Sequence, residues 1–340
     1  MKKYVCLLVC FMLSCIVLIG CKKSDVGKPE AEVVKITLNY ANFPPASTFP
    51  CVQMERWKTE VEKRTGGKVE VKTFPGGSLL DAKDMYDGVV AGQADIGCLC
   101  MAYQPGRFVV TNALSLPLGI KDAKIGSKAL WDIFNKYNPQ EFAEVKVLTM
   151  FTTAPSNIMS RKPIRTLDDI KGASLRASGG AGEILQAWGA NMVGMPMSAT
   201  PEALQKGTVQ GLFSSLEVMQ DFKYADLCKY VTMTDTSVYP FAVVMNKSKW
   251  DALPDDVKTV FDDLAEEQMA WTGDYMDNHV AEAIAFSKES QVEFIELTAE
   301  QKAQWNVLLE PIVAKWIADN NAKVEAGKIV ADVKALISGQ

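Results

Sequence analysis

The segment LPDDVKTVFDDLAEEQMAWTGDYMDNHVAEAIAFSKE, residues 253–289, constrains the architecture of this chain more than any other. It begins with a proline and two acidic residues, which suit the first turn of a helix and the positive end of its dipole. Apolar side chains then recur at helical spacing, and Gly273 is the only helix breaker. The pattern predicts a helix over 254–289, about 36 residues and roughly 54 Å long. Because one small lobe is narrower than this, we expect the helix to span two lobes.

The chain before this helix alternates between strand and helix patterns. β-Branched and alternating apolar residues predict strands at 33–40, 68–74, 94–100, 146–152, 173–177, 209–214 and 239–246. Amphipathic spacing and cap residues predict helices at 49–63, 81–91, 178–189 and from Thr200 onward, with a short capped helix opening at 166–169. This order predicts an α/β fold with mostly parallel sheets covered by helices.

The length of the chain predicts two lobes. About 320 residues follow the N-terminal leader described next, which is more than one hydrophobic core usually organises. We expect lobe I over 33–152 with parts of 240–290, and lobe II over 153–239 with parts of 290–298. Strands are expected to cross between the lobes, and C-terminal helices to occupy 299–340.

The first residues have the pattern of an export signal over 1–20. Two lysines precede an uncharged apolar run over 4–19, and a small residue precedes Cys21. The run is short and is followed by two more lysines, so it is not predicted to cross a membrane as a helix.

The end of this leader, Leu18-Ile19-Gly20-Cys21, resembles the lipobox of bacterial lipoproteins. The resemblance implies that Cys21 is acylated and becomes the mature N-terminus, held by lipid at the periplasmic face of a bacterial membrane. Residues 21–32, which are polar with Gly and Pro, are expected to form a tether. An ordinary signal peptide and a small membrane anchor are the alternatives.

Charge and cysteine content exclude several classes of function. The formal charge of −5 becomes −7 without the two leader lysines, which argues against a nucleic-acid partner. Beyond the leader and Cys21, four cysteines remain, at Cys51, Cys98, Cys100 and Cys228. Their spacing is unlike that of a disulfide scaffold, and the pair around Leu99 is a weak metal motif. We therefore expect buried thiols, no metal site and no cofactor.

Six short segments are distinctive as a set. They are FPGGSLL (74–80), AGQADIG (91–97), LPL (116–118), LDDIKGASLR (167–176), ALQKGTVQG (203–211) and NKSKWDALP (246–254). In this order, with the long helix after them, they resemble the extracytoplasmic solute-binding proteins of tripartite ATP-independent periplasmic (TRAP) transporters, DctP type. The resemblance runs from Val33 to about Trp316.

This resemblance implies a two-lobe, periplasmic-binding-protein-like fold that closes on a small organic acid by a hinge motion. The expected partners are that ligand and two membrane subunits, one small and one large, and we expect a monomer. An ABC-type or sensory solute-binding lipoprotein is the alternative. An enzyme is disfavoured because the single histidine, His279, lies inside the long helix and no nucleophile elbow is present.

Arg176 is the strongest candidate for ligand binding. It ends a predicted parallel strand and precedes the helix that Ser178-Gly179-Gly180 opens, and ligands of α/β sheets bind beyond the carboxyl ends of strands. A helix N-terminus attracts anions, and a guanidinium matches a carboxylate with two hydrogen bonds. A lone arginine is more often part of a surface ion pair, but the family resemblance implies that this one clamps a ligand carboxylate.

The chain also departs from its relatives near the expected site. Sialate-binding relatives carry a second arginine in the strand that corresponds to 147–153, where this chain has Phe151. Phe213 and Ser214 replace a Glu-Asn pair that is common in the family, whereas Asn42 matches a polar family position. Apolar walls favour an apolar ligand body, so the predicted ligand is a monocarboxylate with an apolar or aromatic body. The predicted ligand-binding residues are Arg176, Ser214, Phe213, Asn42, Phe151, Tyr103 and Tyr239, with core packing as the alternative for each aromatic.

Overall fold

The computed structural model describes residues 35–104 and 106–339. The predicted signal peptide, Cys21 and the tether lie outside these residues. In the part of the chain that is described, no helix is both long and apolar enough to cross a membrane.

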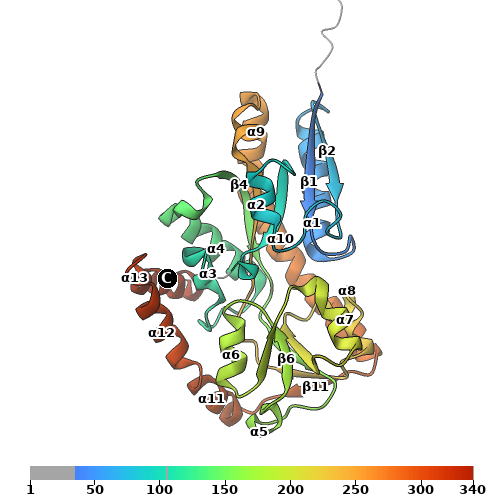
Figure 1. Cartoon of the computed structure of the whole chain (residues 1–340), viewed down its shortest axis with the longest axis vertical. Helices are drawn as coiled ribbons and strands as arrows, with labels where there is room; N and C mark the ends of the chain where they lie inside the picture. The colour runs from blue at the N-terminus through green and yellow to red at the C-terminus, as the bar shows by residue number, and fades with distance from the viewer. Residues whose placement is uncertain (1–34, 105, 340) are drawn as a thin grey trace, which may run out of the picture. The chain divides into compact units, whose positions relative to one another are not determined.

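The first sheet has five strands in the order β2-β1-β3-β10-β4. Its strands are β1 (Ile36–Asn42), β2 (Val69–Phe74), β3 (Ile96–Cys100), β4 (Val145–Thr152) and β10 (Pro240–Asn246). The sheet joins distant parts of the chain, because β10, at residues 240–246, lies between β3 and β4, which come much earlier in the sequence. We call the part of the fold built on this sheet lobe I; it occupies the upper half of Figure 1.

The second sheet has six strands in the order β11-β9-β5-β8-β6-β7. Its strands are β5 (Asn157–Ser160), β6 (Ser174–Ala177), β7 (Asn191–Gly194), β8 (Gly211–Ser214), β9 (Tyr230–Met233) and β11 (Glu293–Glu296). We call the part of the fold built on it lobe II; it occupies the lower half of Figure 1. The two-lobe α/β fold predicted from the sequence is therefore confirmed.

Both sheets are mixed, and the antiparallel pairs have one cause. The chain leaves lobe I after β4, enters lobe II as β5, leaves it as β9 and returns as β10. A strand that returns must run against the strand that left, so β10 is antiparallel to β4, and β9 to β5. The two crossing segments are joined by hydrogen bonds from the backbone N–H of Thr153 to the Tyr239 carbonyl (3.0 Å) and from that of Ser156 to the Ser237 carbonyl (2.7 Å).

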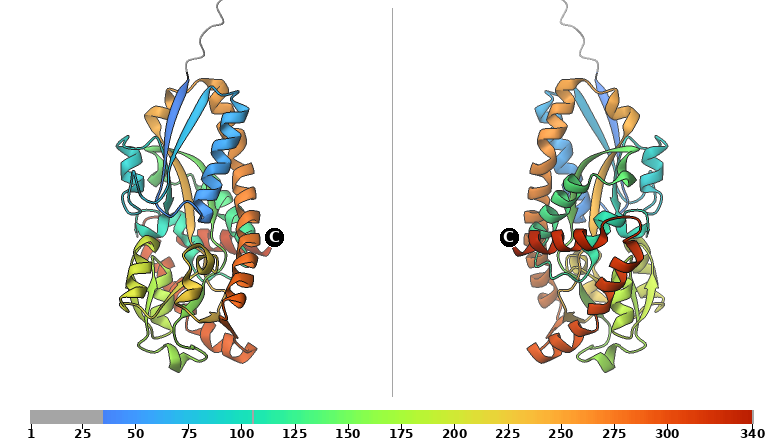
Figure 2. Two further views of the ribbon diagram at one scale, coloured as in Figure 1. Left: turned by 90° about the vertical axis from the view of Figure 1, so that its right-hand side faces the viewer. Right: turned by 90° about the vertical axis from the view of Figure 1, so that its left-hand side faces the viewer.

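The long helix is α10 (Asp255–Glu289), with 35 residues; it starts one residue after the predicted 254 and ends at the predicted 289. In lobe I it packs on β4, on α1 (Phe49–Arg64) and on α4 (Ala123–Tyr137), and further along it contacts α8 (Val218–Asp221), which follows β8 of lobe II. Figure 2 shows it running beside both lobes, as its length predicted.

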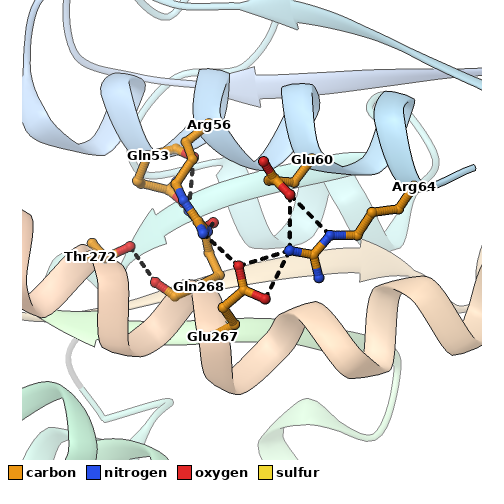
Figure 3. Close-up of polar contacts among 7 residues, drawn as sticks. All are labelled: Gln53, Arg56, Glu60, Arg64, Glu267, Gln268 and Thr272. Carbon is orange, nitrogen blue, oxygen red and sulfur yellow. Dashed lines mark hydrogen bonds and ion pairs between the residues drawn. The ribbon is translucent and has the colours of Figure 1, made fainter.

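Polar contacts fix α10 against α1 (Figure 3). Arg56 and Arg64 both pair with Glu267, with N–O distances of 2.7 and 2.8 Å, and these groups are partly exposed. The neighbouring Gln268 is fully buried and donates from its side-chain amide to the backbone carbonyl of Gln53 at 2.9 Å. The contact between the helices thus combines an exposed ion-pair network with a buried amide bond.

The remaining helices surround the sheets. They are α2 (Met85–Val90), α3 (Val109–Asn112), α5 (Leu167–Ile170), α6 (Ala181–Ala187), α7 (Thr200–Gln205), α9 (Lys247–Asp251), α11 (Ala299–Val307), α12 (Glu310–Asn320) and α13 (Ala326–Ser338). Short 3₁₀ turns lie at Met101–Tyr103, Ala113–Ser115, Gln140–Phe142, Met197–Ala199 and Tyr224–Asp226. The helix predicted over 81–91 begins only at Met85, and α4 and the strands β5, β7, β9 and β11 were not predicted.

The expectation of buried thiols is confirmed. Cys51, Cys98, Cys100 and Cys228 are all buried and free. Trp188 belongs to the core: its indole N–H donates to the carbonyl of Trp305 at 3.1 Å, and the two rings pack edge to face.

Candidate functional site

A pocket is lined by residues of both sheets and of the segments that cross between them. Its apolar wall is mostly aromatic and is formed by Phe43, Phe49, Tyr103, Phe222, Tyr239 and Phe241. Its basic residue is Arg176, and its acidic residues are Glu217 and Asp221. Such a pocket, apolar with a few convergent polar groups, is typical of a small-molecule site.

Arg176 lies at the carboxyl half of β6 (Ser174–Ala177), and its side chain is 1% exposed. Its Nε donates to the carbonyl of Met195 at 3.0 Å, and its Nη2 donates to the hydroxyl of Ser178 at 2.9 Å. That hydroxyl in turn donates to Met195 at 2.8 Å. The Nε and Nη2 groups that form these bonds lie on the same edge of the guanidinium group, and the bonds fix its orientation.

No carboxylate of the described residues lies within 4.0 Å of the Arg176 guanidinium. A buried charge without a counter-ion is costly, because the solvation lost on burial is not replaced. Since Arg176 lines the pocket, an anion bound there would supply the missing partner. The planar guanidinium suits a carboxylate.

Two tyrosines stand near Arg176 in the pocket. The Tyr103 hydroxyl accepts the backbone N–H of Met197 at 3.1 Å, and the Tyr239 hydroxyl donates to the Phe213 carbonyl at 3.1 Å. Burial raises the pKa of Tyr239 to about 12, although the charge of Arg176 acts in the opposite direction, and burial also raises the pKa of Tyr103. Both hydroxyls are therefore neutral, and Tyr103 retains its proton for donation to a ligand.

Four of the seven predicted site residues line this pocket: Arg176, Ser214, Tyr103 and Tyr239. The other three lie behind its walls. Phe151 is fully buried and stacks on the pocket residue Phe241 with ring centres 5.3 Å apart. Phe213 is also fully buried and packs edge to face on Trp188 at 5.6 Å.

Asn42 supports the loop that forms one wall of the pocket. Its amide donates to the Pro50 carbonyl at 2.7 Å, and its side-chain oxygen accepts the Phe43 N–H at 3.0 Å. These two bonds close the turn between β1 and α1 that carries Phe43 and Phe49. Asn42, Phe151 and Phe213 thus shape the pocket without lining it.

The pocket also has an acidic part, which was not predicted from the sequence. Glu217 and Asp221 both line it, and both are buried from solvent. Asp221 lies 2.7 Å from Nε2 of His279 on α10, and its other oxygen accepts the backbone N–H of Phe49 at 3.3 Å. The sequence holds one signal for this pair: the two acids are four residues apart, a spacing that places side chains on the same face of a helix.

The chemistry of the remaining groups is limited. Among residues 35–104 and 106–339, no cluster of three His, Cys, Asp or Glu side chains could hold a metal ion. Cys100 lines the pocket, but burial raises the pKa of its thiol to about 12, so it is not a thiolate at neutral pH. The arrangement is suited to binding a small anion.

Comparison with known proteins identifies the family. The sequence profile of the bacterial extracellular solute-binding protein family 7, DctP, matches residues 40–320. A TRAP periplasmic solute-binding protein from Desulfovibrio salexigens, solved as an open complex, is 52% identical, with a TM-score of 0.80 over 89% of this chain and 96% of that one.

Two further relatives have a stated ligand class. A TRAP solute-binding protein from an unidentified marine microbe, described as specific for aromatic acid ligands and solved with metahydroxyphenylacetate, is 27% identical, with a TM-score of 0.86 over 90% of this chain and 99% of that one. The C4-dicarboxylate-binding periplasmic protein DctP of Rhodobacter capsulatus is 27% identical over 81% of this chain and 83% of its own length.

These matches span most of the chain, both lobes included. Proteins of this kind bind small organic acids in the periplasm and work with the membrane subunits of TRAP transporters. The expectation that the chain is not an enzyme is confirmed by the same matches. The chain belongs to the DctP family of bacterial extracellular solute-binding proteins and is a TRAP transporter solute-binding protein.

Proposed function

We propose that this protein captures a monocarboxylate with an apolar or aromatic body and delivers it to the small and large membrane subunits of its TRAP transporter. The observation that carries the proposal is the guanidinium of Arg176, which is 1% exposed and lines the pocket. Its protein partners are a carbonyl and a hydroxyl, neither of which neutralises its charge. A ligand carboxylate would do so.

The ligand body is inferred from the rest of the pocket. Phe241 packs on Phe43 and on Phe49, with ring centres 6.3 and 5.6 Å apart, and the three rings form an apolar wall. Burying an apolar group against such a wall stabilises the complex, whereas polyhydroxylated acids would leave hydroxyls without partners. The marine relative described as specific for aromatic acids supports the same class.

Calorimetry tests the anion clamp. Arg176→Ala should weaken the binding of the best aromatic or branched monocarboxylate at least tenfold, because the charged hydrogen bonds are lost. Arg176→Lys should restore only part of the affinity, since an ammonium group cannot form the paired contact. The control is Arg165→Ala, which removes an exposed arginine that pairs with Glu293. Unchanged affinity in Arg176→Ala would refute the clamp.

The same measurement with a panel of acids tests the ligand class. Benzoate, 3-hydroxybenzoate and branched oxo acids should bind, whereas succinate and a uronate should bind poorly. Tight binding of a uronate without binding of any aromatic or branched acid would overturn the assignment.

Ligand delivery requires that the lobes close and open. The candidate hinge is the pair of crossing segments, 153–156 and 234–239, which are bonded to each other. Hinge segments of this type absorb the rotation of two rigid lobes. Small-angle scattering should therefore detect a smaller radius of gyration when a ligand saturates the protein, and an unchanged radius would argue against closure.

The location of the protein is part of the proposal. Cys21 is proposed to carry lipid at the mature N-terminus, because Leu18-Ile19-Gly20-Cys21 resembles a lipobox. Cys21→Ser should move the protein from the membrane fraction to the soluble exported fraction. Retention of this variant in the membrane fraction would contradict lipidation.

A further inference from the structure

The pocket has an acidic end as well as the basic end at Arg176. This acidic end consists of Glu217 and Asp221, with His279 of α10 behind Asp221. Glu217 follows β8 and is 2% exposed, and Asp221 ends the short helix α8. A purely monocarboxylic ligand brings no positive charge to this end of the pocket.

Asp221 already has its partners. It lies 2.7 Å from His279, whose pKa is raised to about 9 by that hydrogen bond, so a protonated imidazole balances the carboxylate at neutral pH. Its second oxygen accepts a backbone N–H from Phe49 at the first turn of α1. Asp221 and His279 therefore form a closed pair that needs nothing from a ligand.

Glu217 forms no ion pair with a described residue, although the Ser215 hydroxyl lowers the pKa of its carboxyl group by hydrogen bonding. Its Oε2 is buried, and no hydrogen-bond donor among the described residues reaches it. A buried acceptor without a donor costs free energy, and such atoms are rare in folded proteins. Because Glu217 lines the pocket, a bound ligand is the group that could supply the donor.

The two ends of the pocket are distinct in their surroundings. The charge of Arg176 acts on the pKa values of Tyr103 and Tyr239, whereas the charges that most affect Glu217 are those of Asp221 and His279. Aromatic rings, including Phe49 and Phe241, contribute to the wall of the same pocket. A complementary ligand therefore carries opposite charges on an apolar frame.

Resting on the proposed function, we propose that the ligand is an amino acid in the chemical sense, whose carboxylate binds Arg176 and whose ammonium group donates to Glu217. The ammonium group supplies a donor and a positive charge to Glu217, the pocket acid that forms no ion pair among the described residues. This assignment narrows the class of monocarboxylates to those with an amino group, and the apolar body remains against the aromatic wall.

Matched ligand pairs test this inference by calorimetry. Phenylalanine is compared with 3-phenylpropanoate, and 3-(aminomethyl)benzoate with 3-ethylbenzoate, so that each pair differs in the amino group and the two pairs differ in its distance from the carboxylate. In at least one pair the amine should bind tenfold or more tightly, as expected for a charge-assisted hydrogen bond in a dry site. Equal or tighter binding of the non-amino acid in both pairs would overturn the inference and leave the anion clamp intact. No binding of any of the four acids would instead count against the proposed function itself.

The Glu217→Gln variant tests whether Glu217 causes the preference for the ligand with an amino group. Glu217→Gln keeps the size of the side chain and removes its charge, so the preference for the amine should be lost while the non-amino acid still binds. Glu202→Gln, which changes an exposed acid on α7, is the matched control and should keep the preference. A Glu217→Gln protein that retains the full preference would refute the role of Glu217.

Proton release gives a second measurement that needs no variant. Burial raises the pKa of Glu217 to about 7, so part of the protein carries a proton there at neutral pH. An ammonium group can bind only to the carboxylate form, so amine binding at pH 7 should release protons into the buffer. Titrations in two buffers of different ionisation enthalpy measure this release, and proton uptake on amine binding would contradict the proposal. Asp221 and His279 face the same region, and both belong to the closed pair.

Discussion

Gly273 and Lys124 lie so close that a Cβ added to the glycine would stand 2.8 Å from the Cα of the lysine. One turn later on the same face of α10, Asp277 accepts the backbone N–H groups of Ala123 at 2.8 Å and Lys124 at 3.1 Å. The start of α4 is therefore seated directly on the backbone of α10. The only interruption in the apolar pattern of the long helix marks this close approach.

Replacing Gly273 with Ala should destabilise the protein. Alanine favours a helix by about 1 kcal/mol over glycine, but the clash with backbone atoms forces the two helices apart, which costs about 1–3 kcal/mol. We expect a net loss of stability in denaturant unfolding. Gly327→Ala in α13 is the control, because a Cβ there meets only the side chain of Ile317 at 3.9 Å. A Gly273→Ala protein as stable as Gly327→Ala would contradict the packing argument.

Adjacent residues of α10 should differ in their contribution to stability (Figure 3). Glu267 pairs with two arginines but its side chain is 44% exposed, and exposed ion pairs contribute roughly 0–1 kcal/mol. Gln268 is fully buried and bonded to Gln53, so its loss leaves buried groups without partners and should cost about 2 kcal/mol or more. Glu267→Ala and Gln268→Ala are compared by urea unfolding, and a larger loss for Glu267→Ala would show that the ranking is wrong.

Stability should fall with rising pH in two separate windows. His279 binds its proton more tightly in the folded protein, with a pKa raised from 6.5 to about 9, so its contribution is complete below pH 6.5 and is lost as the pH rises through 9. Burial raises the pKa of Glu217 from 4.5 to about 7, so folding also favours its protonated form and stability falls between these values.

Variants separate the two windows. His279 is the only histidine of the chain, so His279→Gln should remove the decline above pH 7, which we expect to be about 2 kcal/mol. Glu217→Gln should remove the decline below pH 7 and reduce the other only slightly, because Asp221, and not Glu217, is the main cause of the raised pKa of His279. Urea unfolding at intervals from pH 4.5 to 9.5 measures both, and a profile that is flat for the unaltered protein would refute the assigned shifts.

The hydroxyl of Tyr239 should affect ligand binding through the pocket wall. Tyr239→Phe removes a group that lines the pocket and donates to the Phe213 carbonyl. We expect the affinity for the best ligand to fall roughly threefold to tenfold, the effect of one neutral hydrogen bond. The control is Tyr137→Phe, whose hydroxyl donates to Asp332 and lies outside the pocket. Equal affinities of the two variants would exclude a role for the Tyr239 hydroxyl.

Local sequence pattern was sufficient for the long elements. The helix over 254–289 was predicted almost to the residue, because Pro254 and the two acids mark its start and its periodicity is sustained over many turns. Arg176 could be assigned to the end of a strand for a similar reason, since Ser178-Gly179-Gly180 directly after it is a local signal that the strand stops. Four residues are too few for a clear period, so the pattern was less reliable for strands of this length: β6 and β8 were predicted, whereas β5, β7, β9 and β11 were not.

Which side chains face the ligand depended on the packing of the two lobes. Successive residues of a strand point to opposite sides, so Phe213 and Ser214 cannot both line one cavity, and the fold turned Ser214 to the pocket and Phe213 to Trp188. Phe151 was predicted to contact the ligand, but Phe241 of the neighbouring strand stacks on it and separates it from the pocket. The amino acids alone established two lobes, a spanning helix and an arginine at a strand end. The acidic end of the pocket arose only when α8 of one lobe met α1 of the other, since no local pattern records a contact between residues 172 positions apart.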